Sequence, residues 1–199
     1  MKTQCAGLVL LLAGAASGSL AAQSSRAESY GVAVRTATVD QKAPSAVLPG
    51  DGSMAQNQAS NVTVASLVTA QNAYAIASGA SDGALSDAVS SATLGQVSVL
   101  SGLITADGIV AMASSTLGSS NAEGSSLANL VVNGVQLDDP APNTVVSLPG
   151  VGYAVLNEQI ATAEGITVNM IHVVLQQTVL GVTRNTGDII VGSASSGVN

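Results

Sequence analysis

The stretch LVVNGVQL, residues 130–137, decides the fold class of this chain. An apolar, β-branched run precedes Asn133-Gly134, and a second strand-like run follows it. Asn-Gly between two such runs is typical of a two-residue type I′ turn, in which both turn residues adopt positive φ. A turn this tight joins antiparallel strands. The stretch therefore predicts an antiparallel β-hairpin.

Two other dipeptides predict further tight turns. Asp107-Gly108 interrupts the strand-like run 103–111, and Pro149-Gly150 interrupts the run 145–156. Asp-Gly favours the same hairpin turn as Asn-Gly. Pro-Gly suits a type II turn with Pro at the second position and Gly at the third. Both dipeptides therefore predict antiparallel neighbours.

The composition agrees with a β-protein. The chain is 47% hydrophobic and 9% charged, and three Tyr are its only aromatic residues. Val, Ala, Ile and Leu are interleaved with Ser, Thr and Asn, which is typical of half-buried strands. We predict one all-β domain, an antiparallel β-sandwich with long strands and closely spaced layers. The fold has at most one short helix, for which residues 84–92 are the only candidate, and residues 40–52 are predicted to form an irregular connection.

An internal repeat supports an alternative to the sandwich. Residues 67–78, LVTAQNAYAIAS, align without gaps with residues 103–114, LITADGIVAMAS, at an offset of 36. Repeats with periods of about 20 to 50 residues are typical of solenoids. A short β-solenoid or β-helix is therefore the alternative fold.

The N-terminus has the layout of a secretory signal peptide. Lys2 precedes an apolar run over residues 6–16, and small residues follow it. The run is shorter than the about 20 residues that a membrane-spanning helix needs. We therefore predict that the protein is exported.

Two positions satisfy the small-x-small rule for cleavage, after Ala21 and after Ala27. We prefer the second, because strand-like sequence begins near Ser29. A signal peptide over residues 1–27 would leave residues 28–199 as a single all-β domain. The one cysteine, Cys5, precedes both sites, so the mature chain would contain neither a disulfide nor a reactive thiol.

The charge balance restricts the partners. Removal of residues 1–27 leaves Arg35, Lys42 and Arg184 against twelve acidic residues, a net charge of −9. Nucleic-acid binding depends on basic side chains that neutralise phosphates, so this balance argues against it. Anionic membranes are disfavoured for the same reason. We expect other protein chains or cell-surface components as partners, with no nucleic acid and no transmembrane segment in the mature chain.

The C-terminal part resembles a known family. The sequences PAPNTVVSLPGVGYAVLNEQ (140–159), ITVNMIHVVL (166–175) and GDIIVGSAS (187–195) are similar to secreted bacterial proteins named choice-of-anchor P, and the similarity extends loosely upstream through residues 29–35 and 100–111. The resemblance implies an extracellular protein without an established enzymatic activity. It also implies that members differ in how, or whether, they are held at the cell surface.

One nominal catalytic motif is present. Residues 79–83, GASDG, match the nucleophile-elbow pattern G-x-S-x-G, and the order Ser81, Asp138, His172 is that of a hydrolase triad. The chain lacks the alternating strands and helices of that fold. Sequences rich in Gly and Ser also match this pattern by chance.

His172 is the only histidine, so any histidine chemistry must use it. It lies in a segment that is apolar on both faces, which predicts a covered central strand and a packed, hydrogen-bonded histidine. Zinc needs three or four nitrogen or sulfur ligands. Asp138-Asp139 lacks the spacing of a calcium loop, and Glu158 and Glu164 flank a predicted turn. We predict no catalytic residue, no metal and no cofactor.

Two functions from different classes follow. The preferred one is a secreted, non-enzymatic structural or adhesive protein of the extracellular space or cell surface. The alternative is a small secreted serine hydrolase that uses Ser81 and His172. The distance between these two side chains discriminates between them, because a nucleophile and its base lie within hydrogen-bond reach.

Overall fold

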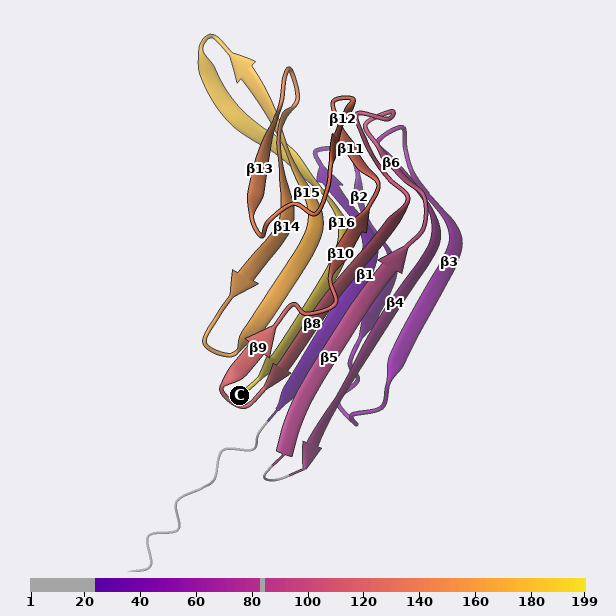
Figure 1. Cartoon of the computed structure of the whole chain (residues 1–199), viewed down its shortest axis with the longest axis vertical. Helices are drawn as coiled ribbons and strands as arrows, with labels where there is room; N and C mark the ends of the chain where they lie inside the picture. The colour runs from indigo at the N-terminus through magenta and orange to yellow at the C-terminus, as the bar shows by residue number, and fades with distance from the viewer. Residues whose placement is uncertain (1–23, 83–84) are drawn as a thin grey trace, which may run out of the picture.

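Two antiparallel β-sheets pack face to face in this protein (Figure 1). The computed structural model describes residues 24–82 and 85–199. Within these residues every regular element is a strand, which confirms the predicted all-β, sandwich-like fold. The described residues contain no helix that is long and apolar enough to cross a membrane.

The first sheet has six strands in the order β13-β14-β15-β16-β1-β2. Its N-terminal and C-terminal strands are neighbours, because β1 pairs with β16 from Ser25 opposite Val198 to Thr36 opposite Gly187. The strand bounds are β1 (Ser25–Thr36), β2 (Asp40–Val47), β13 (Thr144–Leu148), β14 (Gly152–Ala161), β15 (Gly165–Val179) and β16 (Val182–Val198).

The second sheet has ten strands, eight of them in the order β10-β8-β5-β4-β6-β7-β11-β12, while β3 pairs with β4 and β9 with β8. The bounds are β3 (Ala55–Val64), β4 (Val68–Asp82), β5 (Leu85–Leu94), β6 (Val97–Val99), β7 (Ile104–Ala106), β8 (Gly108–Thr116), β9 (Ser119–Asn121), β10 (Ser126–Ala128), β11 (Leu130–Val132) and β12 (Val135–Leu137).

Two of the three predicted turns are confirmed. Asn133 and Gly134 have φ of 52° and 75°, and they join β11 to β12 with Val132 opposite Val135. Gly150 has φ of 76°, and the Val151 N–H donates to the Leu148 carbonyl at 2.9 Å. These values fit the type I′ and type II turns that the dipeptides favour.

The predicted hairpin at Asp107-Gly108 is wrong. The chain runs on from β7 to β8, because β7 pairs with β6 while β8 pairs with β5. The Asp107 N–H donates instead to the Ala128 carbonyl.

Asp107 lies on a crease, a row of residues at which the pairing between adjacent strands is interrupted. Others on this crease are Ser60, Asn72, Gly95 and Asn129. Figure 1 shows β3 and β4 changing direction part-way along.

A second crease crosses the six-stranded sheet. The residues omitted from its pairing are Asn157, Met170, Gly192, Gly31 and Pro44. Gly192 has φ of 66°, and a Cβ there would lie 2.6 Å from Cγ2 of Ile109, which follows the crease of the other sheet. The two creases therefore meet in the core, and glycine permits this close approach.

The internal repeat reflects neighbouring strands and not a solenoid. Val68 and Ile104 both pair with Val99, from opposite sides. Tyr74 and Val110 likewise both pair with Thr93. Equivalent residues of the two repeat copies, 36 positions apart, therefore lie on opposite sides of the β5–β6 segment. Each copy of the repeat crosses the crease. All pairing is antiparallel, so the solenoid alternative is wrong.

Residues 85–92 of the candidate helix form a strand instead, since β5 starts at Leu85, and residue 84 lies outside the described residues. Ala88, Ala92 and Leu94 are buried at intervals of two or four residues, which is the period of a strand. Small Ala and Ser side chains fit either structure locally, and pairing with β4 and β8 decides between them. Residues 40–47, expected to be irregular, form β2 along the edge of β1.

The start of β1 bears on the predicted cleavage site. β1 begins at Ser25 and not near Ser29, Ala27 is buried, and Arg26 forms an ion pair with Glu164. Cleavage after Ala27 would remove three paired residues of this strand. The structure thus contradicts the reason for preferring Ala27. The other site, Ala21, lies outside the described residues.

The core contains Val, Ala, Ile, Leu and Met side chains from both sheets. A second, smaller cluster at the end that contains Ala27 and Val198 is mostly alanine. Serine side chains cross between the sheets near this end: the Ser29 hydroxyl donates to the Ile76 carbonyl and the Ser90 hydroxyl to the Ser195 carbonyl, each at 2.9 Å. Small residues let the layers approach closely enough for these bonds.

Candidate functional site

A polar network crosses three neighbouring strands on the outer face of the six-stranded sheet. Ser193 donates to the Asn169 amide oxygen at 2.7 Å, and Asn169 Nδ2 donates to Glu158 Oε2 at 2.6 Å. His172 Nδ1 lies 2.9 Å from the same Glu158 oxygen, and its Nε2 lies 3.3 Å from Asp188 Oδ1. The residues face outward because they alternate with core residues along the strands. Met170 and Gly192, which the pairing omits, each add one residue, so Asn169 shares the outer face with His172 and Ser193 shares it with Asp188 despite their odd spacing.

The charges of this network support one another. The hydrogen bond to His172 is the main cause that lowers the pKa of Glu158, and Asn169 adds to it against the effect of burial. The hydrogen bond to Glu158 raises the pKa of His172, partly offset by burial, with a further contribution from Asp188. The network thus favours a protonated imidazole between two carboxylates.

A hollow of about 300 Å³ lies over this network. It is lined by Ala33, Arg35, Glu158, Ile160, Asn169, His172, Asp188 and Ile190. Both ring nitrogens of His172 face carboxylate oxygens, so neither is directed at a bound molecule. This arrangement ties β14, β15 and β16 together, as expected for a satisfied half-buried histidine.

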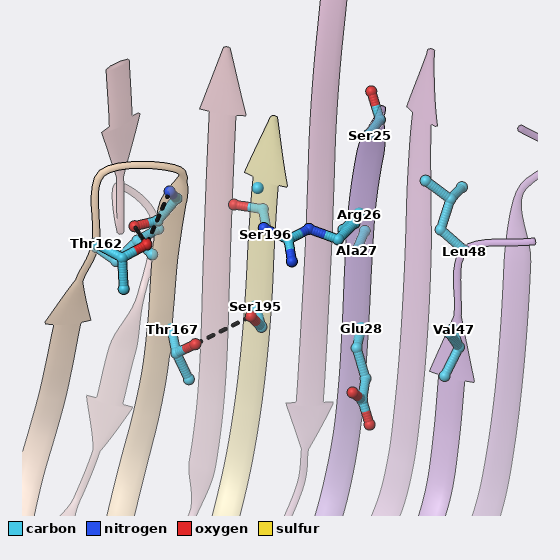
Figure 2. Close-up of a pocket in the computed structure, with 13 residues that line it drawn as sticks. Ser25, Arg26, Ala27, Glu28, Val47, Leu48, Thr162, Thr167, Ser195 and Ser196 are labelled. Carbon is cyan, nitrogen blue, oxygen red and sulfur yellow. Dashed lines mark hydrogen bonds between the residues drawn. The ribbon is translucent and has the colours of Figure 1, made fainter. Parts of the chain in front are cut away.

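A larger hollow of about 470 Å³ lies on the same face, towards the C-terminal end of β16 (Figure 2). Five of its thirteen lining residues carry a hydroxyl group, and the hydroxyl groups of Thr167 and Ser195 are 3.0 Å apart. Arg26 crosses it to pair with Glu164, and Lys42 pairs with Glu28 at 2.6 Å. Its charged groups are thus neutralised within the chain.

The structure does not bring together the residues of the predicted hydrolase. Ser81 is 3.0 Å from the Ser25 hydroxyl, near the start of β1. His172 lies in the cross-strand row of Ala33, eight residues further along β1. At about 3.3 Å per residue, this separation exceeds about 20 Å. The serine-hydrolase alternative therefore lacks a nucleophile paired with its base.

Of the other carboxylates considered from the sequence, Glu158 belongs to this network, whereas Asp138 and Glu164 lie apart from it. Asp138 accepts a hydrogen bond from Gln136 at 3.0 Å in the connection after β12. Glu164 lies in the β14–β15 turn and pairs with Arg26, while Glu158 contacts His172. Among the described residues no group of three or more His, Cys, Asp or Glu is arranged to hold a metal ion.

A second feature stands out from the body of the protein. β14 begins opposite Leu175 and β1 ends opposite Gly187, so beyond these points β15 and β16 pair only with each other. Residues 177–186, which we call the arm, are all exposed. Figure 1 shows this hairpin projecting past the other strands. The arm is the most accessible regular structure in the described chain.

The tip of the arm is apolar. Val179 and Val182 are more than half exposed, and Leu180 between them is 99% exposed. The turn residues Leu180 and Gly181 have φ of 52° and 78°. A leucine rarely adopts positive φ. The arm therefore presents an apolar residue in a backbone conformation that Asn or Gly would adopt more easily.

Scans against protein-family models, curated proteins and solved structures found no match to this chain. The choice-of-anchor P resemblance therefore stays a prediction.

The two hydrogen-bond partners of His172, Glu158 and Asp188, were not predicted from the sequence. Asp188 gave a weak signal, because it is a charged residue at the start of an apolar strand. The arm was also missed, and the signal for it was Leu180-Gly181 between two polar, β-branched runs.

Proposed function

We propose that this protein is a secreted, non-enzymatic structural or adhesive protein of the extracellular space or cell surface, acting through contacts with other protein chains. The exposed arm with its apolar tip carries this proposal. An exposed apolar group on a projecting element is a common feature of interaction sites. A ribbon with two free edges also offers backbone groups to a partner strand.

The polar network fits this role better than a catalytic one. His172 is held between Glu158 and Asp188, and Ser193 donates to Asn169 rather than to the histidine. A network in which each group satisfies another stabilises the sheet that bears the arm. We therefore assign it a structural role.

Export rests on the predicted signal peptide. With β1 beginning at Ser25, we propose cleavage after Ala21, which leaves the Arg26–Glu164 ion pair in place. Intact mass and N-terminal sequencing of the secreted protein should show a start at Ala22. A start at Glu28, or a retained residue 1, would contradict this proposal.

Adhesion is tested with the purified secreted protein. The wild-type protein should bind to the surface of intact producing cells, and Leu180→Asp should bind on the order of tenfold less. Leu117→Asp is the matched control, because Leu117 is also the first residue of an exposed Leu-Gly turn, between β8 and β9. Surface binding that is absent, or equal in all three proteins, would refute the proposed role of the arm.

A further inference from the structure

The outer face of the ten-stranded sheet carries a regular array of polar side chains, in two rows that cross β3, β4 and the β5–β6 segment. One row is set by Thr69, which pairs with Thr63 on one side and Ser98 on the other. The second row is set by Gln71, which pairs with Asn61 and exchanges backbone hydrogen bonds with the turn between β5 and β6. The residues between the two rows on each strand are buried in the core, so both rows point outward. We call six side chains the polar array: Asn61, Thr63, Thr69, Gln71, Gln96 and Ser98.

The polar array surrounds a hollow of about 230 Å³. Each of its three hydroxyl groups and three carboxamides can both donate and accept hydrogen bonds. Among the described residues, none forms a hydrogen bond with these six side chains. The network on the six-stranded sheet differs, because Glu158, Asn169, His172 and Asp188 satisfy one another. The hydrogen-bonding groups of the polar array are therefore available to a ligand.

The strands that form this face carry almost no charge. Residues 52–81 and 88–106 contain no Asp, Glu, Lys or Arg, although 9% of the whole chain is charged. A charged ligand would find no opposite charge here. A purely apolar ligand would leave the hydroxyl groups and carboxamides without partners. The complementary ligand is a neutral molecule that is dense in hydroxyl groups.

An exposed aromatic ring continues this face along β4, beyond the crease. Tyr74 is 47% exposed, and it pairs with Gln58 of β3. Together with Gln56, Gln58 and Ile76 it lines a second hollow, of about 270 Å³. A tyrosine ring presents an apolar face and a polar tip. These features suit a sugar ring, which has an apolar face and a rim of hydroxyl groups.

We propose that the outer face of β3 and β4 binds a neutral polysaccharide. The polar array forms hydrogen bonds with sugar hydroxyl groups, and Tyr74 stacks on a neighbouring sugar ring of the same chain. From Thr69 to Ile76 the site extends about 20 Å along β4, which accommodates several sugar units. The site lies on the opposite sheet from the arm and takes a different class of ligand. It therefore adds to the proposed function and does not depend on it.

Binding of the purified secreted protein to insoluble polysaccharides tests this directly. The probes are cellulose, curdlan and cross-linked dextran, which are all neutral, and the protein left in solution after centrifugation gives the Kd. The wild-type protein should bind at least one of them. Binding should persist in about 1 M NaCl, where the Debye length is only about 3 Å. Binding that this salt abolishes would show adsorption through charge and would overturn the proposal.

Substitutions within the face locate the site. Tyr74→Ala, and Asn61→Ala combined with Gln71→Ala, should each raise the Kd on the order of tenfold, because stacking or several hydrogen bonds are lost. Gln136→Ala and Tyr153→Ala are the matched controls. Gln136 lies on the same face outside both hollows, and Tyr153 lies on the outer face of the other sheet. Both controls should bind like the wild type, and circular dichroism melting shows whether each variant is folded.

Three results would overturn the proposal. The first is a wild-type protein that binds none of the three polysaccharides. The second is equal binding by the wild type, Tyr74→Ala and the double variant. The third is a wild-type protein that binds no polysaccharide and forms oligomers that Tyr74→Ala dissociates, which would assign this face to a second copy of the chain.

The arm variant separates this inference from the proposed function. Leu180→Asp should bind polysaccharide like the wild type, and loss of binding in this variant would overturn the assignment to β3 and β4. A protein that binds polysaccharide but not cells refutes adhesion to the producing cell and supports the polysaccharide site. A protein that binds cells in an arm-dependent manner but binds no polysaccharide refutes this inference and leaves adhesion intact.

Discussion

Two hairpin turns of this protein have nearly the same backbone and different residues. Asn133 and Leu180 both have φ of 52°, and the glycines that follow have φ of 75° and 78°. Asn133 is a residue that tolerates this conformation, and its side chain donates to the Ser147 carbonyl of β13. Leu180 is a poor choice for the same conformation and is 99% exposed.

The difference shows which turn is determined by the fold. The Asn133 turn belongs to a hairpin whose Leu130 and Val132 are buried in the core, so its geometry and its residues serve packing. The Leu180 turn lies at the end of an arm without core contacts. Its geometry follows from the tight connection of two strands, and its leucine adds nothing to the core because the side chain is exposed to solvent.

The largest expected effect on stability comes from replacing the positive-φ glycine of a turn with a β-branched residue. Gly134→Val should lower the free energy of unfolding by about 2–3 kcal/mol, because a β-branched residue is strongly disfavoured at φ of 75° and the strain passes to a packed hairpin. Gly181→Val should lower the melting temperature much less, since the arm can open while both sheets remain folded. Thermal unfolding monitored by circular dichroism measures both.

Gly50→Val is the control for this pair. Gly50 lacks positive φ, and nothing lies within 4 Å of the position of its Cβ. Equal losses of stability in Gly134→Val and Gly181→Val would show that the arm unfolds together with the body.

The Asn133 side chain itself gives a smaller effect. Asn133→Ala removes the hydrogen bond to Ser147 and the tolerance of positive φ, and we expect a loss of about 1 kcal/mol. Asn133→Gly should recover the part due to φ but not the part due to the hydrogen bond. Chemical denaturation that shows no difference between the three proteins would contradict the role of this side chain.

The stability of the body, but not of the arm, should depend on pH through the network at the base of the arm. The pKa of Glu158 is lowered, so its contribution is present above about pH 4.3 and is lost as pH falls through the lowered pKa. The pKa of His172 is raised, so its contribution is present below about pH 6.5 and is lost as pH rises through the raised pKa.

The melting temperature should therefore be highest between about pH 4.3 and 6.5 and decline on both sides, by a few degrees at most because His172 is in contact with solvent. His172→Gln should remove the decline on the alkaline side. Hydrogen exchange of the arm, corrected for its intrinsic pH dependence, should not follow this profile. An unchanged alkaline decline in His172→Gln would assign it to another group.

The smallest expected effect on stability comes from Leu180→Asn. This variant separates the stability of the turn from the function of the arm. Asn is more favourable than Leu at positive φ, so we expect the stability to stay the same or to rise by a few tenths of a kcal/mol. Binding to intact producing cells should nevertheless be weakened. A stabilised variant that binds cells like the wild type would show that Leu180 has no role in adhesion.

The sequence predicts what depends on neighbouring residues along the chain. Asn133-Gly134 and Pro149-Gly150 were placed correctly, since the φ angles of a tight turn are a property of the dipeptide. The all-β class follows from β-branched residues interleaved with hydroxyl residues. The prediction that His172 is a packed, hydrogen-bonded histidine without a catalytic role is confirmed as to its hydrogen bonds. The sequence did not identify Glu158 and Asp188 as its partners.

Only the tertiary structure decides what depends on pairing across the sheets. Asp107-Gly108 has the composition of a hairpin turn, yet the chain continues there, because β5 and β6 hold β8 and β7 on one line and the crease absorbs the change of direction. Residues 85–92 have mostly small side chains that fit a helix or a strand, and the adjacent strands β4 and β8 select the strand. Local conformation is encoded in dipeptides, whereas register, the meeting of the two creases at Gly192, and the projection of the arm arise from contacts between residues far apart in the sequence.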